Sequence, residues 1–218
     1  MTAVRKYENL FLLAIGAVCL VISAIRPYDW LTWWLEAIPA IAGAAILIAV
    51  HRRFRFTQLV YHLVLIHALI LILGAHYSYA RVPFGFWLQD LFDLSRNPYD
   101  RIGHFAQGFF PVIIVREVLL RSTPLRRGRW LFFLVVSVCL AFSAFYEFIE
   151  WWAALAGGES AEAFLGTQGD VWDTQSDMFM ALLGAISAQL LLAGIHDRAL
   201  RKMETNHQQQ FSTIKKAQ

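Results

Sequence analysis

The chain has 218 residues, which on length alone indicates a single domain. Hydrophobic residues make up 58% of it and charged residues 16%, whereas average soluble chains hold about 45–50% and about 25%. This composition excludes a disordered chain, a disulfide-rich scaffold and an ordinary soluble domain, and it predicts a multi-pass membrane protein. The two cysteines, Cys19 and Cys139, lie within apolar stretches and give no sign of a disulfide.

Six stretches are apolar and long enough to cross a membrane, because about 20 residues of helix span a hydrocarbon core of about 30 Å. In chain order these predicted spans cover residues 9–25, 31–50, 56–75, 102–120, 130–151 and 178–195. Backbone groups cannot stay unpaired in lipid, so the predicted fold class is an all-α membrane helix bundle. We expect residues 1–203 to form the six-span domain and residues 204–218, which are polar, to form a flexible tail.

The predicted connections differ strongly in their content of Lys and Arg. Fourteen of these residues lie at the N-terminus, in the second and fourth connections and in the C-terminal tail, whereas four lie in the other connections. Because cytoplasmic segments carry the excess of Lys and Arg, both termini are predicted to be cytoplasmic. The same distribution explains the net charge of +3 without a nucleic-acid partner, so the lipid bilayer is the expected surrounding.

Two of the three predicted outer connections are long, and seven of the eight tryptophans lie on that side. Within the first long connection, residues 84–94 place Phe84, Trp87 and Leu91 at helical spacing. This pattern predicts a short helix that lies in the membrane interface. A loop packed on the outer ends of the spans is an equal alternative.

Acidic and histidine side chains gather near the outer ends of the later spans. Asp100 and His104 are four residues apart at the start of the fourth span. Glu147 and Glu150 are three residues apart near the outer end of the fifth span. Each pair therefore shares one face of its helix.

A third acidic group precedes the sixth span. Asp170, Asp173 and Asp177 fall at positions i, i+3 and i+7, which would align them on one stripe of a helix. Gly166 and Gly169 weigh against helix at the start of this stretch.

Acids gathered in this way repel one another and need a cation, a proton or an arginine partner. Carboxylates together with histidine suit Zn, Mn or Fe, whereas carboxylates alone suit Mg or Ca. The spacing matches no high-specificity motif such as HExxH. The sequence predicts a divalent metal ion held by Asp100, His104, Glu147, Glu150, Asp173 and Asp177. The catalytic candidates among these ligands are His104, Glu147 and Glu150.

Structural roles are the alternative for the same residues. Arginines on the outer side can pair with nearby acids: Arg81, Arg96 and Arg101 with Asp90, Asp93 and Asp100. Asp173 can cap the last helix, where an anion favours the N-terminus. Four acids are better explained as a solvated face: Asp90, Asp93, Glu159 and Glu162. Arg116, near the cytoplasmic end of the fourth span, is expected to snorkel to the headgroups.

Three stretches resemble the YjdF family of bacterial inner-membrane proteins. They are DRIGHFAQGFFP (100–111), YEFIEWW (146–152) and LGTQGDVWDTQSDM (165–178). The six-span layout matches as well, so the resemblance covers most of the chain apart from its polar tail. It implies a bacterial inner-membrane location but no substrate, because the family has no established activity. A weaker similarity to VanZ-like membrane proteins rests on Asp100, His104, Asp177 and Gly184.

The leading hypothesis is an outward-facing metal site that acts on a lipid or an envelope-linked substrate. A metal-bound water would be the nucleophile, and Tyr146 or Gln107 would orient the substrate. One alternative is a small proton- or cation-coupled transporter, for which a homo-oligomer would supply the second half, because no internal repeat is visible. The other alternative is a non-catalytic membrane partner. The sequence does not decide whether the protein is an enzyme.

Overall fold

The computed structural model describes residues 3–157 and 167–216. Two of the acids expected to be solvated, Glu159 and Glu162, lie outside the described residues. The described elements are α1 (Ala3–Ser23), α2 (Trp30–Val50), α3 (Gln58–Tyr77), η1 (Tyr79–Arg81), α4 (Pro83–Phe92), α5 (Tyr99–Phe109), α6 (Pro111–Ser122), α7 (Arg129–Gly157) and α9 (Asp173–Lys216).

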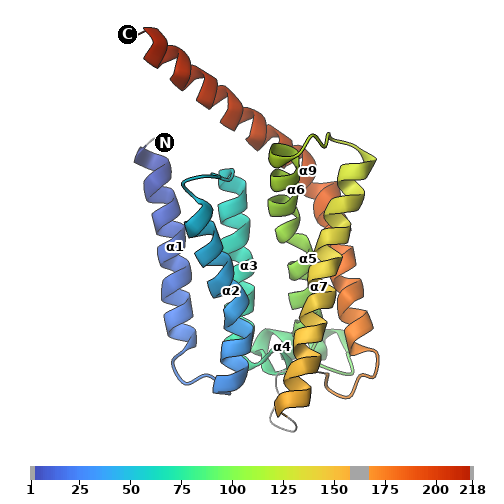
Figure 1. Ribbon diagram of the computed structural model, residues 1–218. Helices are drawn as coiled ribbons and strands as arrows, with labels where there is room; N and C mark the ends of the chain where they lie inside the picture. Colours follow the sequence, from blue (N-terminus) through green and yellow to red (C-terminus); the bar gives the residue numbers. More distant parts are fainter. Residues whose placement is uncertain (1–2, 158–166, 217–218) are drawn as a thin grey trace.

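The long helices run up and down beside one another, and both chain ends lie at the same end of the bundle (Figure 1). Helices α1, α2 and α3 form one group, and α5, α6, α7 and α9 form the other (Figure 1). Helix α3 joins the two groups, because the Tyr99 hydroxyl at the start of α5 donates a hydrogen bond of 2.9 Å to the Ile70 carbonyl of α3. The short helix α4 lies at the end opposite the termini (Figure 1).

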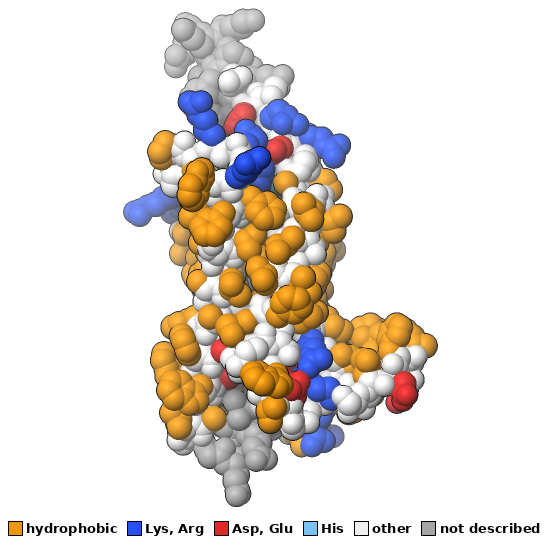
Figure 2. Space-filling model, turned by 90° about the vertical axis from the view of Figure 1, so that its right-hand side faces the viewer, with side chains coloured by type: hydrophobic (Ala, Val, Ile, Leu, Met, Phe, Trp, Pro, Cys, Tyr) orange, Lys and Arg blue, Asp and Glu red, His pale blue; other side chains and the backbone are white. Residues whose placement is uncertain are grey.

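The fold is a helical membrane bundle, as predicted. The described residues contain five candidate spans that are long and apolar enough to cross a membrane, and α1 contributes a shorter apolar helix over Tyr7–Ser23. Hydrophobic side chains cover the middle of the bundle, and charged side chains lie above and below this band (Figure 2). The exposed large side chains are the expected ones for a surface that faces lipid acyl chains.

The fourth predicted span, 102–120, consists of two helices. Helix α5 ends at Phe109, and α6 begins at Pro111. Proline has no backbone N–H to continue the hydrogen-bond ladder, which accounts for the break in the assignment. Phe110 keeps right-handed helical backbone angles, so the two helices follow one another and together form one candidate span, Tyr99–Ser122.

The sixth predicted span, 178–195, is part of a much longer helix. Helix α9 begins at Asp173 and continues to Lys216, and its candidate span covers Asp173–Thr205. The expected boundary at residue 204 therefore falls inside a helix, whose last part takes in residues 204–216 of the segment that we expected to be flexible. That segment holds glutamines and lysines but neither Gly nor Pro, so nothing in its composition breaks the helix.

Two glycines allow α5 and α9 to cross closely. A Cβ atom added at Gly108 would lie 1.9 Å from the Ala181 carbonyl oxygen, and one added at Gly184 would lie 2.1 Å from the Phe105 carbonyl oxygen. Small residues permit such backbone contact between membrane helices. The crossing places the first turns of α5 and α9 next to each other, which is where four of the six predicted ligands lie: Asp100, His104, Asp173 and Asp177.

Candidate metal centre

Five of the six predicted metal ligands come together at the end of the bundle that carries α4. We call Asp100, His104, Glu147, Glu150 and Asp177 the outer cluster. Asp100 and His104 lie on the first turns of α5, Glu147 and Glu150 on α7, and Asp177 on the first turns of α9. Their convergence follows from the i, i+3 and i+4 spacings, which put each pair on one helix face, and from the close crossing of α5 and α9.

The outer cluster contains two groups of three side chains that share one histidine. The first group is Asp100, His104 and Asp177, and the second is His104, Glu147 and Glu150. Within each group, ligand atoms from all three side chains lie within 4.8 Å of one another. The His104 Nε2 atom is 3.7 Å from an oxygen of Asp100 and 3.7 Å from an oxygen of Glu147.

Several polar atoms of the outer cluster are buried without a hydrogen-bond partner. They are His104 Nδ1, Glu147 Oε1 and Asp177 Oδ1, on side chains whose residues are 5%, 6% and 2% exposed. A buried polar atom left without a partner costs about 1–3 kcal/mol. Donor atoms of this kind, held near one another in a protein interior, are suited to coordinate a cation.

The sixth predicted ligand, Asp173, pairs with an arginine instead. Its carboxylate makes a buried ion pair with the Arg96 guanidinium, which also lies 3.4 Å from Asp100 and 3.5 Å from Asp170. Neither of the two groups that could hold an ion, among the described residues, includes Asp173. Arg96 therefore pairs mainly with Asp173 at the rim of the site and also reaches Asp100 of the outer cluster.

Asp170 does not share a stripe with Asp173 and Asp177, because α9 begins only at Asp173. Its carboxylate accepts a hydrogen bond of 2.9 Å from the Trp172 backbone N–H and makes an ion pair of 2.6 Å with Arg101. The hydrogen bond from the Trp172 N–H, and then the charges of Arg101 and Arg96, hold the pKa of Asp170 below its usual range.

Asn97 connects the segments that surround the site, and the sequence analysis did not single it out. Its side-chain amide donates to the Val82 carbonyl at the start of α4, and its side-chain oxygen accepts from the Tyr99 N–H at the start of α5. Its backbone N–H and carbonyl are both bonded to the Gln168 side chain. The Asn-Pro pair at residues 97–98 is a turn signal, but its long-range partners have no sequence signature.

One further buried carboxylate lies beside the outer cluster. Glu36 of α2 is 4% exposed, and the Tyr146 hydroxyl of α7 donates to it at 3.4 Å. The Tyr146 ring stands edge-on to His104, with 6.2 Å between ring centroids. Tyr146, which we expected to orient a substrate, thus links the cluster to Glu36. Burial and the nearby Glu36 carboxylate also raise the pKa of Tyr79, on the short helix η1, well above its ordinary value.

A second buried group, which we call the inner network, lies toward the other end of the bundle. It contains Glu117, His196, Arg116, Asp197 and Thr57. Glu117 accepts hydrogen bonds from Thr57 and His196 and pairs with Arg121 at 2.6 Å. Arg116 is 4% exposed and bonds the His196 Nδ1 atom at 2.8 Å and Asp197 at 2.8 Å, so the expectation that it snorkels to the headgroups was wrong.

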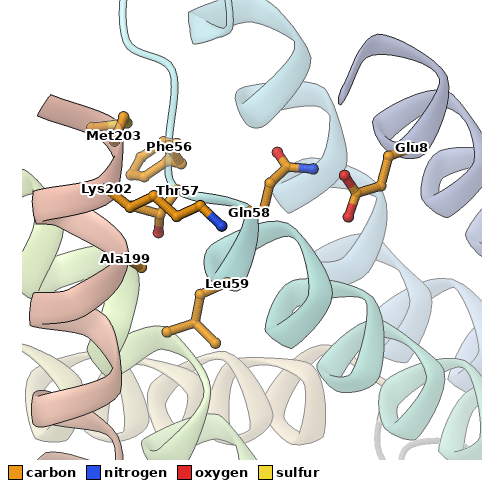
Figure 3. A pocket seen from close by; sticks show the side chains of 8 residues that line it. All are labelled: Glu8, Phe56, Thr57, Gln58, Leu59, Ala199, Lys202 and Met203. Atoms are coloured by element: carbon orange, nitrogen blue, oxygen red, sulfur yellow. The ribbon is translucent and has the colours of Figure 1, made fainter. Parts of the chain in front are cut away.

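The same end carries a cavity of about 310 Å³ between α1, the start of α3 and α9 (Figure 3). Glu8, Thr57 and Lys202 supply polar side chains to its lining. None of the residues of the outer cluster lines it. The predicted metal ligands therefore lie in a packed interior and not in this cavity.

Residues 8–198 match the model of a family described as "Predicted membrane protein (DUF2238)". The inner membrane protein YjdF of Escherichia coli (strain K12) is 51% identical over 183 residues, which cover 84% of this chain and 88% of that protein. The chain belongs to the YjdF family. The outer cluster is thus a feature of a YjdF family member, a helical inner-membrane protein. No solved structure resembles the chain closely enough to show a relationship.

Proposed function

We propose that the outer cluster binds a divalent metal ion and that the protein acts on a lipid or an envelope-linked substrate at the outer face of the inner membrane. The observation that carries this proposal is the set of buried, unpartnered donor atoms on His104, Glu147 and Asp177. The cluster lies at the end opposite the termini (Figure 1). It therefore faces outward if the excess of Lys and Arg places both termini in the cytoplasm.

The mixture of carboxylates and one imidazole favours Zn, Mn or Fe over Mg or Ca. When bound, such an ion polarises a substrate oxygen and lowers the pKa of a water molecule toward neutrality. The chain itself supplies a proton acceptor: Glu150 is the more exposed of the two α7 carboxylates, while Glu147 is buried. This arrangement supports hydrolysis, with Asp100, His104 and Asp177 as ligands and Glu150 as the general base.

A substrate that is part of the membrane fits the surroundings of the site. Trp151, Trp152 and Trp172 are 58%, 50% and 66% exposed near the outer cluster's helix ends. Tryptophans at this level lie among lipid headgroups. Helix α4 exposes Trp87, Leu91 and Phe92 at the same end of the bundle, as an interfacial helix would. Lipid headgroups are therefore the closest source of substrate.

Elemental analysis of the purified full-length protein in detergent tests the metal proposal. Wild type is compared with Glu147→Ala and with Asp93→Asn, a matched control at an exposed acid on the same end of the bundle. We expect bound metal in wild type and in Asp93→Asn, and a loss of metal in Glu147→Ala that stays folded. Equal metal content in all three proteins, or none after metal-supplemented growth, would contradict the proposal.

Proton-coupled transport is the second candidate, and the Tyr146–Glu36 hydrogen bond favours it, because it extends the polar groups beyond the metal ligands. Between the outer cluster and the inner network, however, α6, α7 and α9 pack through an apolar core that includes Val112, Cys139 and Ala185. Uptake measurements with proteoliposomes and an imposed pH gradient test transport directly. If the wild-type protein holds no metal, shows uptake, and loses that uptake in Glu36→Gln, transport is favoured over hydrolysis.

A further inference from the structure

We infer that the outer cluster is built for two metal ions, and that its substrate class is a phosphate ester of a membrane lipid. This inference rests on the proposed metal site and deepens it. The two groups of possible ligands share His104 alone: Asp100 and Asp177 belong to one, and Glu147 and Glu150 to the other. A single ion held by one group would leave the carboxylates of the other group without a metal.

Unpartnered atoms occur in both groups. Asp177 Oδ1 is the buried unpartnered oxygen of the first group, and Glu147 Oε1 is that of the second. His104 Nε2 lies 3.7 Å from an oxygen of Asp100 and from an oxygen of Glu147, so it stands between the two carboxylate pairs. One ion in either group would satisfy the atoms of that group and leave the other oxygen orphaned. Two ions satisfy both.

The charges lead to the same conclusion. The cluster holds four carboxylates, and the buried guanidinium beside them, that of Arg96, is shared between Asp173 and Asp100, to which it donates at 3.4 Å. Arg101 is paired with Asp170 at the rim. Two divalent cations neutralise four ionised carboxylates in a buried site, whereas one cation would leave two of them with only the shared Arg96 as a counter-charge.

Two neighbouring cations suit displacement at phosphorus. Metal pairs about 3.5–4 Å apart stabilise both the attacking and the leaving oxygen of an in-line displacement. In the reaction, the oxygen of water forms a bond to phosphorus while the ester bond between phosphorus and the lipid oxygen breaks. The proton from water passes to the free oxygen of Glu150 and then to the lipid oxygen, which leaves as an alcohol. Phosphate esters at the headgroup level of the outer leaflet present this bond to the site.

The number of ions is measured on the full-length protein in detergent, loaded with Mn²⁺ and freed of excess, by elemental analysis and electron paramagnetic resonance. We expect two Mn²⁺ per chain with a spin-coupled spectrum, which requires no variant. Asp177→Asn and Glu150→Gln are each expected to retain one uncoupled Mn²⁺, and the control Asp93→Asn to retain two. One Mn²⁺ per chain in wild type would overturn this inference and leave the proposed metal site standing, whereas none would overturn both.

The substrate class is tested with inorganic phosphate as the probe. Phosphate is expected to alter the spin-coupled spectrum of the Mn²⁺-loaded wild type at millimolar concentration, and sulfate to do so at least tenfold less effectively. Wild type should also release phosphate from a lipid phosphomonoester in mixed micelles. This activity should be lost in Asp177→Asn and in Glu150→Gln. A two-ion protein that neither responds to phosphate nor releases it would overturn the substrate class.

Discussion

The outer cluster and the inner network both bury ionisable side chains, but they satisfy them differently. In the inner network, both oxygens of Glu117 have donors: Thr57, Arg121 and His196. A guanidinium only donates, so the Arg116 contact makes His196 Nδ1 an acceptor and leaves Nε2–H to donate to Glu117. In the outer cluster, three buried atoms lack hydrogen-bond partners: His104 Nδ1, Glu147 Oε1 and Asp177 Oδ1. Complete pairing indicates a structural role, and missing partners in a packed interior indicate a ligand.

The largest effect should come from breaking the inner network. Glu117→Ala removes the acceptor of Thr57, Arg121 and His196 at once, and breaking a buried ion pair costs about 3–5 kcal/mol. We expect a loss of this size in the free energy of unfolding, measured by denaturant titration in detergent. Glu150→Ala, the matched change in the outer cluster, should cost little in the metal-free protein. Equal losses in the two variants would erase the distinction between the two ends.

Widening the crossing of α5 and α9 should damage the outer cluster selectively. The added methyl group of Gly108→Ala meets the Ala181 carbonyl, and such overpacking costs about 1–3 kcal/mol. We expect metal affinity to fall at least tenfold, because Asp177 is carried away from Asp100 and His104. Gly194→Ala, on the partner helix α9 with open space around it, is the control and should leave metal content unchanged. Retained affinity in Gly108→Ala would show that the crossing does not position the ligands.

Neutralising one outer carboxylate should stabilise the metal-free protein. The Glu147 carboxylate has like-charged neighbours, and one of its oxygens has no partner. Because Glu147→Gln removes this charge, we expect the free energy of unfolding to rise by about 1 kcal/mol. Thermal unfolding with a chelator present measures it, and Asp93→Asn should show no gain. Added metal should then stabilise wild type more than Glu147→Gln. If Glu147→Gln is less stable than wild type when both proteins are free of metal, Glu147 has a structural role and is not kept for a metal.

The smallest effect concerns the rim of the site. The pKa of Asp170 is lower in the folded protein than in the unfolded chain, so its carboxylate stabilises the fold at neutral pH. That contribution is lost as the pH falls through the lowered pKa. Asp170→Asn should therefore reduce the unfolding temperature slightly at neutral pH and match wild type in acid. A difference that persists unchanged in acid would mean that the Asp170 charge is not its cause.

Sequence reasoning found the outer cluster better than the inner network, and the reason is the range of the contacts. Asp100 with His104, and Glu147 with Glu150, are close on their own helices, so spacing alone predicts a shared face. His196 and Thr57 reach Glu117 only through the packing of α9 and α3 against α6. Pairing choices are also long-range: nothing in the spacing distinguishes Asp173, which takes Arg96, from Asp177, which does not. The helical membrane fold itself followed from composition and run length.

The length of α9 gives the two polar groups a further meaning. Asp177 and His196 are nineteen positions apart along this continuous helix, which at a rise of 1.5 Å per residue is about 28 Å. The hydrocarbon core of a bilayer is about 30 Å thick. The two sets of buried charges therefore lie about one hydrocarbon-core thickness apart along α9. We therefore expect these charges to set the depth of the protein in the bilayer, with the outer cluster at the level of the headgroups rather than among the acyl chains.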